Sequence, residues 1–308
     1  MRAAVIASHV LAVLVLPILV LGLMNRTRAL WTGRRGPPLL QPYFELARLV
    51  RKQSVYSVAT TAVFRVGPLV VLATALVGGL LTPLFGVATF RFPYDFVVVA
   101  YLWGLGRALL MLSALDTASS FEGMGASREA TYAALAEPVL FLTLGTLAMA
   151  TGQTSFAGLL HVAVQTPGDV VVRAMSVAAL LVILQVEAAR SPVDDPATHL
   201  ELTMIHEVMI LDHSGPELAA LHYGSAIKLT SCAALIATLL NPLAPSDGAL
   251  RYAGANLVLV AVVAVLVGSI ESLVARLRLK AVPQLILVAM GAALVSLLAG
   301  TWTGGAPG

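Results

Sequence analysis

The stretch EAARSPVDDPATHLELTMIHEVMILDHSG, residues 187–215, separates two long apolar segments and concentrates the polar chemistry of the chain. It contains three histidines and six carboxylates, at Glu187, Asp194, Asp195, Glu201, Glu207 and Asp212. Charge in or beside a lipid bilayer costs free energy and usually marks an ion path, a proton path or a partner. An ordinary polar loop is the simpler interpretation. However, Glu187 and Arg190 flank the end of an apolar run, which favours a functional one.

The composition indicates the class of protein. The 308 residues are 58% hydrophobic and 11% charged, and the mean hydropathy is +0.90. These values are typical of a polytopic membrane protein. The single cysteine, Cys232, excludes an internal disulfide, and one thiolate is too few for an iron–sulfur cluster, which takes about four ligands. Any redox centre that the function requires therefore belongs to another chain.

Eight apolar segments of about 16–20 residues match or approach the length that a membrane-crossing helix needs, roughly 17–25 residues. They lie near residues 5–24, 66–85, 96–115, 133–150, 170–186, 225–240, 255–270 and 282–299. The first could be a signal peptide, but its arginines follow the apolar run and no small-residue cleavage site appears, so it is kept as a span. The predicted fold is all-α, with residues 1–308 forming one transmembrane domain.

Lysine and arginine are divided unequally between the two sides of this arrangement. With the N-terminus outside, fourteen fall on the cytoplasmic side and four outside. Because cytoplasmic loops carry an excess of these residues, both termini are predicted outside and residues 187–215 are predicted to be cytoplasmic. Lys228 is one of the fourteen that are counted as cytoplasmic.

The first predicted cytoplasmic loop has its own helical pattern. Residues 36–38, Gly-Pro-Pro, stop a helix, and a new one is expected after Pro42. Tyr43, Leu46 and Val50 then share an apolar face, which is typical of a helix lying in the membrane interface. Such a helix is either a membrane-surface anchor or a docking surface for a cytoplasmic partner. The candidate docking residues of this loop are Arg34, Arg35, Gln41 and Glu45.

Two further charged positions fall in or near the predicted spans. A helix is expected to start near Arg128 and to run into the fourth span, which places Glu137 about two turns in; alternatively, Glu137 is an acid of the kind tolerated near a helix N-terminus. Arg107 lies inside the third span and needs a partner, because an unpaired arginine there is costly. We expect that partner to be Asp116 or an acid on a neighbouring helix.

The histidines do not form a recognisable metal motif. His206-Glu207 begins like the zinc-protease pattern HExxH, but Ile210 stands where the second histidine is required. His199, His206 and His213 recur every seven residues, which would place them on one side of a continuous helix that residues 215–216, Gly-Pro, would end. We interpret them as polar interface residues. No Walker loop or dinucleotide fingerprint occurs in the sequence, and no metal or nucleic-acid site is predicted in this chain.

Three strings carry a resemblance to a known family: GRRGPPLLQPYFELARLVRK (33–52), GMGASREATYAALAEP (123–138) and ELTMIHEVMILDHSG (201–215). Together they resemble the membrane-anchor subunit of group 4 nickel–iron hydrogenases, also called formate hydrogenlyase subunit 4 or hydrogenase-4 component C. That family is homologous to subunit 1 of respiratory complex I, the NADH dehydrogenase subunit 1 family. The similarity extends over essentially the whole chain.

The departures from subunit 1 of complex I favour the hydrogenase branch. The Arg/Gly/Pro motif before Leu39 is shorter here. The complex I string Glu-Thr-Asn-Arg-x-Pro-Phe-Asp is replaced by EAARSPVD (187–194), which keeps the glutamate, arginine, proline and aspartate but not the Thr-Asn pair. Residues 201–215 are also about three residues longer than their complex I counterpart. Asp212 replaces a usual glutamate, so the correspondence is weakest at that end.

The resemblance implies a bacterial or archaeal plasma-membrane subunit without a cofactor of its own. A cytoplasmic arm would hold the nickel–iron centre in a hydrogenase-like large subunit and iron–sulfur clusters in small subunits. Antiporter-like membrane subunits would complete an oxidoreductase complex that couples electron transfer to proton or sodium movement. The family's buried acids correspond to Glu137, Glu187, Glu201 and Asp212. The supporting charges are Arg128 and Arg190 by the same resemblance, with Arg107, Asp116 and Asp194.

The positions of the acids are consistent with such a relay. Glu137 and Glu187 fall near the cytoplasmic ends of spans that follow one another in the sequence, and burial there favours carboxylates that exchange protons near neutral pH. Two other functions remain. One is a quinone-binding subunit 1 of complex I, with the first-loop helix and the acidic loop framing the quinone entrance. The other is a stand-alone secondary transporter, although the paired half-repeats common in transporters are not evident.

Overall fold

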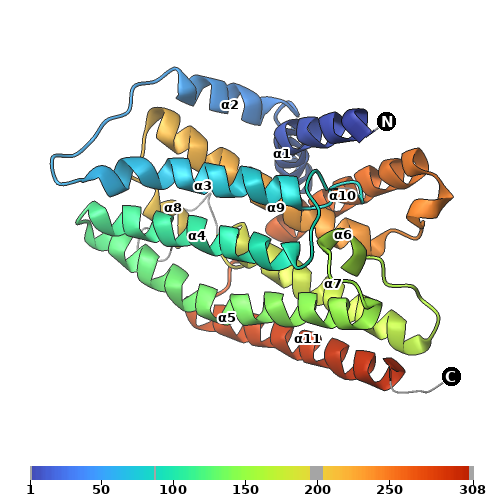
Figure 1. Ribbon diagram of the computed structural model, residues 1–308. Coiled ribbons are helices and arrows are strands. Elements are labelled where there is room, and N and C mark those ends of the chain that lie inside the picture. Colours follow the sequence, from blue (N-terminus) through green and yellow to red (C-terminus); the bar gives the residue numbers. More distant parts are fainter. Residues whose placement is uncertain (1, 87, 195–203, 305–308) are drawn as a thin grey trace.

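The computed structural model describes residues 2–86, 88–194 and 204–304, and within these ranges the chain forms helices and no strands (Figure 1). Eight of the described helices have the length and apolar composition to cross a membrane, which confirms the predicted all-α fold with eight spans. They are α1 (Arg2–Trp31), α3 (Ala62–Leu81), α4 (Asp95–Asp116), α5 (Ser120–Thr151), α7 (Pro167–Glu187), α9 (Gly215–Leu240), α10 (Ala249–Leu273) and α11 (Val282–Gly304).

The eight helices form one bundle whose two termini lie at the same end (Figure 1). Helix α9 is the central helix: 78% of its most apolar stretch is buried, against 28–44% for the other seven. It packs against α1, α3, α7 and α10, while α3 also packs on α4, and α11 on α5 and α7. Because α9 is surrounded, a polar side chain on it must find its partners inside the protein.

Short elements complete the structure. Helix α2 (Gln41–Val50) packs on α9 and α1 and confirms the helix predicted in the first loop; Pro42 occupies its first turn, where a missing N–H is tolerated. We call the end of the bundle that carries α2 the α2 end. The remaining elements are α6 (Phe156–Leu159), α8 (His206–Met209) and the 3₁₀ turns η1 (Pro245–Asp247) and η2 (Leu279–Ala281).

One glycine lets the chain return across α1 before α2 begins. A Cβ atom added to Gly22 would lie 1.9 Å from the carbonyl oxygen of Leu39, a separation that no side chain permits. Gly22 therefore allows residue 39 to pass directly over α1. This close passage fixes the start of α2 against the bundle.

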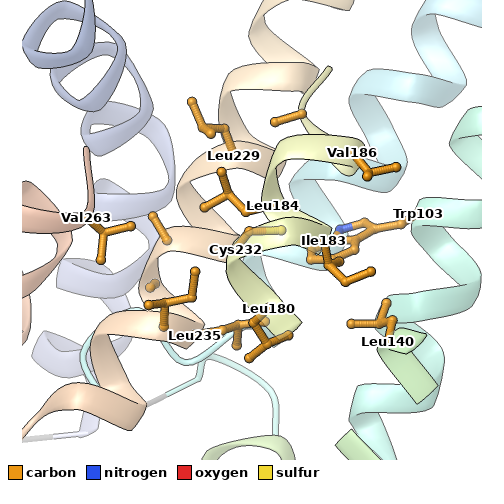
Figure 2. Packing of buried hydrophobic residues seen from close by; sticks show 14 of the residues in the cluster. Trp103, Leu140, Leu180, Ile183, Leu184, Val186, Leu229, Cys232, Leu235 and Val263 are labelled. Carbon is orange, nitrogen blue, oxygen red and sulfur yellow. The ribbon is translucent and has the colours of Figure 1, made fainter. Parts of the chain in front are cut away.

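The apolar core fills the spaces between α4, α5, α7, α9 and α10 (Figure 2). Trp103, Leu140 and Ile183 meet on one side of α9, and Leu235 lies closer to Val263 on the other (Figure 2). The cysteine Cys232 is buried in this core as a free thiol. In a membrane, close van der Waals packing rather than removal of apolar surface from water holds helices together, and this packing keeps the polar residues of the same helices in fixed positions.

Three expectations differ from the structure at the helix ends. Helix α5 begins at Ser120, eight residues before the start expected near Arg128; α9 begins ten residues before the predicted 225, and α3 covers 62–81 rather than 66–85. The continuous histidine-bearing helix is wrong: α8 is four residues long, and Gly215 begins α9 instead of ending a helix. His199 lies outside the described residues. Proline is well suited to a first helical turn, which explains why Pro216 marks a beginning.

Candidate functional site

A cluster of five charged side chains lies inside the bundle. The guanidinium of Arg107, on α4, is 2.9 Å from a carboxylate oxygen of Glu137 and 3.2 Å from one of Glu129, both on α5. It also donates a hydrogen bond to Glu187, the last residue of α7. Lys228, on α9, places its nitrogen 2.6 Å from the other carboxylate oxygen of Glu187. We call these five residues the central cluster.

Four members of the central cluster are largely closed to solvent, while the fifth, Glu137, has 46% of its side chain exposed. Only 5% of the Arg107 side chain and 2% of the Glu187 side chain are exposed. Arg107 lies twelve residues after Asp95, the first residue of α4, which is about 18 Å along the helix axis at 1.5 Å per residue. Three carboxylates face two cations, so the ionised cluster carries one net negative charge, and one added proton makes it neutral.

A small polar cavity of about 50 Å³ adjoins the central cluster. Arg107, Glu187 and Lys228 line it together with His206, Ser225 and apolar residues of α3 and α4. A volume of this size accommodates one or two water molecules beside the charges. The cavity can therefore hold water that exchanges protons with Glu187.

A larger cavity of about 410 Å³ lies beneath α2. His206 and Ser225 line this cavity as well as the small one, so the two adjoin at these side chains. Glu45 and Arg48 of α2, Arg190 and Glu207 contribute further polar groups to its wall. Polar side chains therefore lead from the α2 end to the central cluster.

The segment after α7 is fixed to the bundle by ion pairs. Arg190 lies 3.6 Å from Glu271 of α10, which also pairs with Arg28 of α1 at 3.4 Å. Asp194 pairs with Arg276 at 3.1 Å. These pairs place residues 188–194 against α1 and α10, where they close the side of the larger cavity.

Asp194 also binds the start of the next described segment, which begins at residue 204. Its carboxylate accepts hydrogen bonds from the backbone N–H groups of Ile205 and His206, at 3.1 and 2.9 Å. Arg128 of α5 donates to the carbonyl oxygen of Met204 at 2.8 Å. Both supporting charges therefore position α8 rather than touching the central cluster.

Two groups of α8 have perturbed pKa values. Burial, reinforced by the nearby positive charges, lowers the pKa of His206 to about 3, so the imidazole is neutral at pH 7. Burial raises the pKa of Glu207 to about 7, although Arg190 opposes the shift. Glu207 therefore exchanges protons near neutral pH, and neutral His206 carries one donor and one acceptor nitrogen. Both line the larger cavity.

A second buried polar group lies closer to the α2 end. The ring of His213 stacks on Phe64 with 3.9 Å between centroids, and its Nε2 is 3.1 Å from the hydroxyl oxygen of Ser113. Its Nδ1 is 3.7 Å from Glu217, whose carboxylate accepts a 2.5 Å hydrogen bond from the Tyr56 hydroxyl. Burial lowers the pKa of His213 to about 4, so this histidine is a neutral structural group at pH 7.

The structure brings some of the predicted residues together and separates others. Glu137, Glu187 and Arg107 meet in the central cluster. Asp116 is not the partner of Arg107; it accepts hydrogen bonds from Thr61 and caps α3. Arg190, one of the predicted supporting charges, pairs with Glu271. The preceding turn directs it there, because the N–H of Arg190 bonds back to Gln185.

The other predicted relay and docking residues lie away from the cluster. Asp212 is exposed, and its backbone N–H donates to the buried carboxylate of Glu122 at 3.1 Å. Glu201 lies outside the described residues. Arg34 and Arg35 are exposed between α1 and α2, where Gln41 donates to Glu45 within α2 at 3.2 Å.

Sequence reasoning missed Glu129 and Lys228. Lys228 was counted as a cytoplasmic residue although it lies inside the predicted span 225–240, and a charge within a span is itself a signal for an internal partner. Glu129 gives a weaker signal, because it follows Arg128 at the expected start of a helix and precedes the apolar span that begins near residue 133. The structure places it 15% exposed beside Arg107.

Among residues 2–86, 88–194 and 204–304, no three histidine, cysteine or carboxylate side chains are placed to share a metal ion. The polar chemistry of the described site is therefore that of ion pairs, titratable groups and the cavities between them.

Comparisons with known proteins place the chain in a family. A family model described as NADH dehydrogenase matches residues 4–301. The chain is 30% identical to hydrogenase-4 component C of Escherichia coli over 238 residues, 77% of this chain and 74% of the relative. It is 29% identical to formate hydrogenlyase subunit 4 of the same organism over 289 residues, 90% and 93% of the two chains.

A solved structure shares the fold. A chain in the structure of the membrane-bound sulfane sulfur reductase, an archaeal respiratory membrane complex, superposes with a TM-score of 0.81. The match covers 97% of this chain and 98% of that one at 16% identity, which shows a common fold. Taken with the match over residues 4–301, these similarities show that the chain belongs to the NADH dehydrogenase family.

Proposed function

We propose that this chain is the membrane subunit of an energy-converting oxidoreductase complex. It anchors a cytoplasmic arm composed of a nickel–iron hydrogenase-like large subunit and iron–sulfur small subunits, and it connects that arm to antiporter-like membrane subunits. The redox centres belong to the arm. The role of this chain is to couple their electron transfer to proton or sodium movement.

The observation that carries the proposal is the central cluster and its route to the α2 end. Glu187 is held between Arg107 and Lys228 and adjoins a cavity that meets a larger one at His206 and Ser225. Buried ionisable groups at membrane depth are costly and mark ion or proton paths. Similarity to subunits named for hydrogenase and formate hydrogenlyase supports this kind of complex.

The proposed relay runs through Glu187 and Glu137. Arg107 touches both carboxylates, so a change in the charge of one alters the electrostatic potential at the other. Glu207 and His206 supply protons from the larger cavity. Asp212, at the α2 end, stays a proposed member, and so does Glu201, which lies outside the described residues.

The proposed docking surface is at the α2 end. Arg34 and Arg35 are exposed there, and α2 presents Gln41 and Glu45 on the same end of the bundle. Exposed charges of this kind steer a partner and set its register. A soluble arm docked here would cover the larger cavity and place its redox chemistry next to Glu207.

The partners that remain bound after mild detergent extraction test the assignment of the complex. We expect a tagged chain to retain a nickel–iron large subunit, iron–sulfur small subunits and antiporter-like membrane proteins, identified by mass spectrometry and metal analysis. Isolation of the chain as a monomer that transports a solute in liposomes would contradict the proposal and favour a stand-alone secondary transporter.

A second candidate function is quinone binding, as in subunit 1 of complex I. An apolar groove of about 460 Å³ lies between α1, α2, α3 and α9 and shares Leu46 with the larger polar cavity. Tyr43, Leu72 and Ala219 are among its lining residues. An apolar groove beside a polar cavity fits a quinone tail and head group.

Filling the groove distinguishes the two candidates. In the quinone case, Ala219→Trp should abolish quinone reduction by the purified complex and leave reduction of an artificial electron acceptor unchanged. In the hydrogenase case, the parent complex shows no quinone-dependent activity for this change to remove. Ala148→Trp, on α5 and distant from the groove-lining residues, is the matched control for added bulk.

A further inference from the structure

Glu137 differs from the other members of the central cluster in its exposure. Its side chain is 46% exposed, against 5% for Arg107, 15% for Glu129 and 2% for Glu187. Tyr101 on α4 and Ala134 on α5 are exposed as well, and these two helices pack against each other (Figure 1). One carboxylate of the cluster therefore reaches the outside of this chain.

The depth of Glu137 makes this exposure unfavourable in contact with lipid. Helix α5 extends from Ser120 to Thr151, and Glu137 is seventeen residues from its start and fourteen from its end. At 1.5 Å per residue, it lies about 21 Å from the nearer end of the helix. Charged side chains at such depths face protein or a water-filled cavity rather than hydrocarbon.

The surface around Glu137 is shaped for close approach of another helix. On α4, a Cβ atom added to Gly104 would lie 3.6 Å from Oε1 of Glu137, so the glycine leaves the carboxylate accessible. On α5, the exposed residues beside it are small or compact, namely Ala134, Pro138 and, two turns further, Gly145. Small residues at a helix surface let two membrane helices approach closely.

The charge of the cluster indicates what the approaching helix carries. Three carboxylates and two cations leave one negative charge uncompensated when all are ionised. Arg107 is the ion-pair partner of Glu137 among the described residues, and it is shared with Glu129 and Glu187. An additional cation or hydrogen-bond donor beside Glu137 would complete the balance.

We propose that the surface formed by Tyr101, Gly104, Ala134, Glu137 and Pro138 is the contact site for a transmembrane helix of a neighbouring membrane subunit. That helix places a lysine, arginine, histidine or amide side chain against the exposed carboxylate of Glu137. The inference rests on the proposed function in one respect, that the chain works beside other membrane subunits. It adds which face they occupy and which side chain meets Glu137.

Photo-crosslinking in the assembled complex tests the contact. A benzoylphenylalanine introduced at Ala134 should crosslink to a membrane helix of another subunit, and the crosslinked peptide should contain a basic or amide residue. Val262 is the control position, because it is exposed on α10, which packs on α1 and α9 instead. Probes at Val262 should not capture that peptide.

A bulky substitution supplies a second readout. Ala134→Trp should reduce retention of the crosslinked subunit in detergent by at least about fivefold, since a large side chain prevents close helix packing, while the soluble arm stays bound. Val262→Trp should leave retention unchanged. Capture of lipid alone, of the soluble arm or of a second copy of this chain at Ala134 would overturn the proposal.

The outcome is separable from the relay itself. Glu137→Gln keeps a hydrogen-bonding side chain, so the crosslink at Ala134 should persist. A persistent crosslink with unchanged ion transport would remove Glu137 from the relay and leave the interface standing. If the probe at Ala134 forms no crosslink in a complex that retains Glu137, the proposed interface is wrong, while the proposed relay is unaffected.

Discussion

Lys228 places its ammonium nitrogen 2.6 Å from Glu187 and so joins the middle of α9 to the end of α7. The ammonium also lies 5.8 Å from the ring centre of Trp103. A lysine in the most buried helix thus has a carboxylate and an aromatic ring as partners. This pair closes the central cluster on the side opposite Arg107.

Removal of Lys228 should destabilise the protein through the charge left on Glu187. Taking one partner from a buried ion pair costs up to about 3–5 kcal/mol, and Arg107 should limit the loss to the lower part of that range. We expect Lys228→Met to lower the thermal unfolding midpoint of the purified complex. The double variant Lys228→Met/Glu187→Gln should lose less than the sum of the single variants; strict additivity would show that the two residues do not interact.

The stability of residues 204–214 should depend on pH in two opposite ways. The pKa of His213 in the folded protein, about 4, lies below the ordinary 6.5. Neutral His213 therefore contributes fully to folding stability above pH 6.5, and this stabilisation is lost as the pH falls towards 4. The pKa of Glu207 in the folded protein, about 7, lies above the ordinary 4.5. Protonated Glu207 therefore contributes fully to folding stability below pH 4.5, and this stabilisation is lost as the pH rises towards 7.

Hydrogen exchange of the backbone in this segment checks both signs. Exchange rates are first corrected for the intrinsic effect of pH. His213→Gln should then reduce the loss of protection between pH 6.5 and 4, and Glu207→Gln should reduce the loss of protection between pH 4.5 and 7. Identical pH profiles for the parent and both variants would contradict the assignment of these two groups.

The predicted orientation follows from the distribution of lysine and arginine and can be measured by labelling. In a Cys232→Ala background, a cysteine at Arg34 should react with an impermeant maleimide only in inverted vesicles. Arg251 is exposed at the start of α10, at the other end of the bundle, and a cysteine there should react only in intact cells. The reverse pattern would invert the protein in the membrane.

Charge reversal tests the docking surface. Arg34→Glu/Arg35→Glu should weaken retention of the soluble arm by about tenfold, because each exposed ion pair contributes roughly 0.2–1 kcal/mol and reversal adds repulsion. Added salt should weaken the parent complex towards the variant, since exposed charges are screened. Arg251→Glu is the control. If the soluble arm binds the Arg34→Glu/Arg35→Glu variant as tightly as the Arg251→Glu control at low salt, the docking surface lies elsewhere.

The sequence predicts the helices well where apolar runs are long. It predicts helix ends less well where polar residues have their hydrogen-bond and ion-pair partners inside the protein. The sequence located α5 and α9 but placed their starts too late, near Arg128 and residue 225, because acids such as Glu122 and Glu217 are typical of loops. In the structure these two acids bond to groups of the protein. Hydropathy describes the preference of a single residue for water or lipid, and it does not include partners within the protein.

The site was predicted in part for the same reason. Glu137, Glu187 and Arg107 stood out as charges in or at the ends of apolar spans, and they meet in the structure. Their mutual geometry does not follow from the sequence, because Arg190 is the basic residue nearest to Glu187 along the chain, whereas Arg107 and Lys228 contact it in the structure. The turn after α7 instead sends Arg190 to Glu271. Partners separated by forty or more residues, such as Lys228, are set by helix packing alone.

The central claim, that Glu187 couples redox chemistry to ion movement, is tested most directly by Glu187→Gln in the purified complex reconstituted in liposomes. The variant should assemble and reduce an artificial electron acceptor at the parent rate, while redox-driven ion transport falls at least about tenfold, because the amide keeps the size but does not titrate. Glu271→Gln, which removes an equally buried carboxylate outside the cluster, should retain transport. Parent-level ion transport in Glu187→Gln would contradict the account.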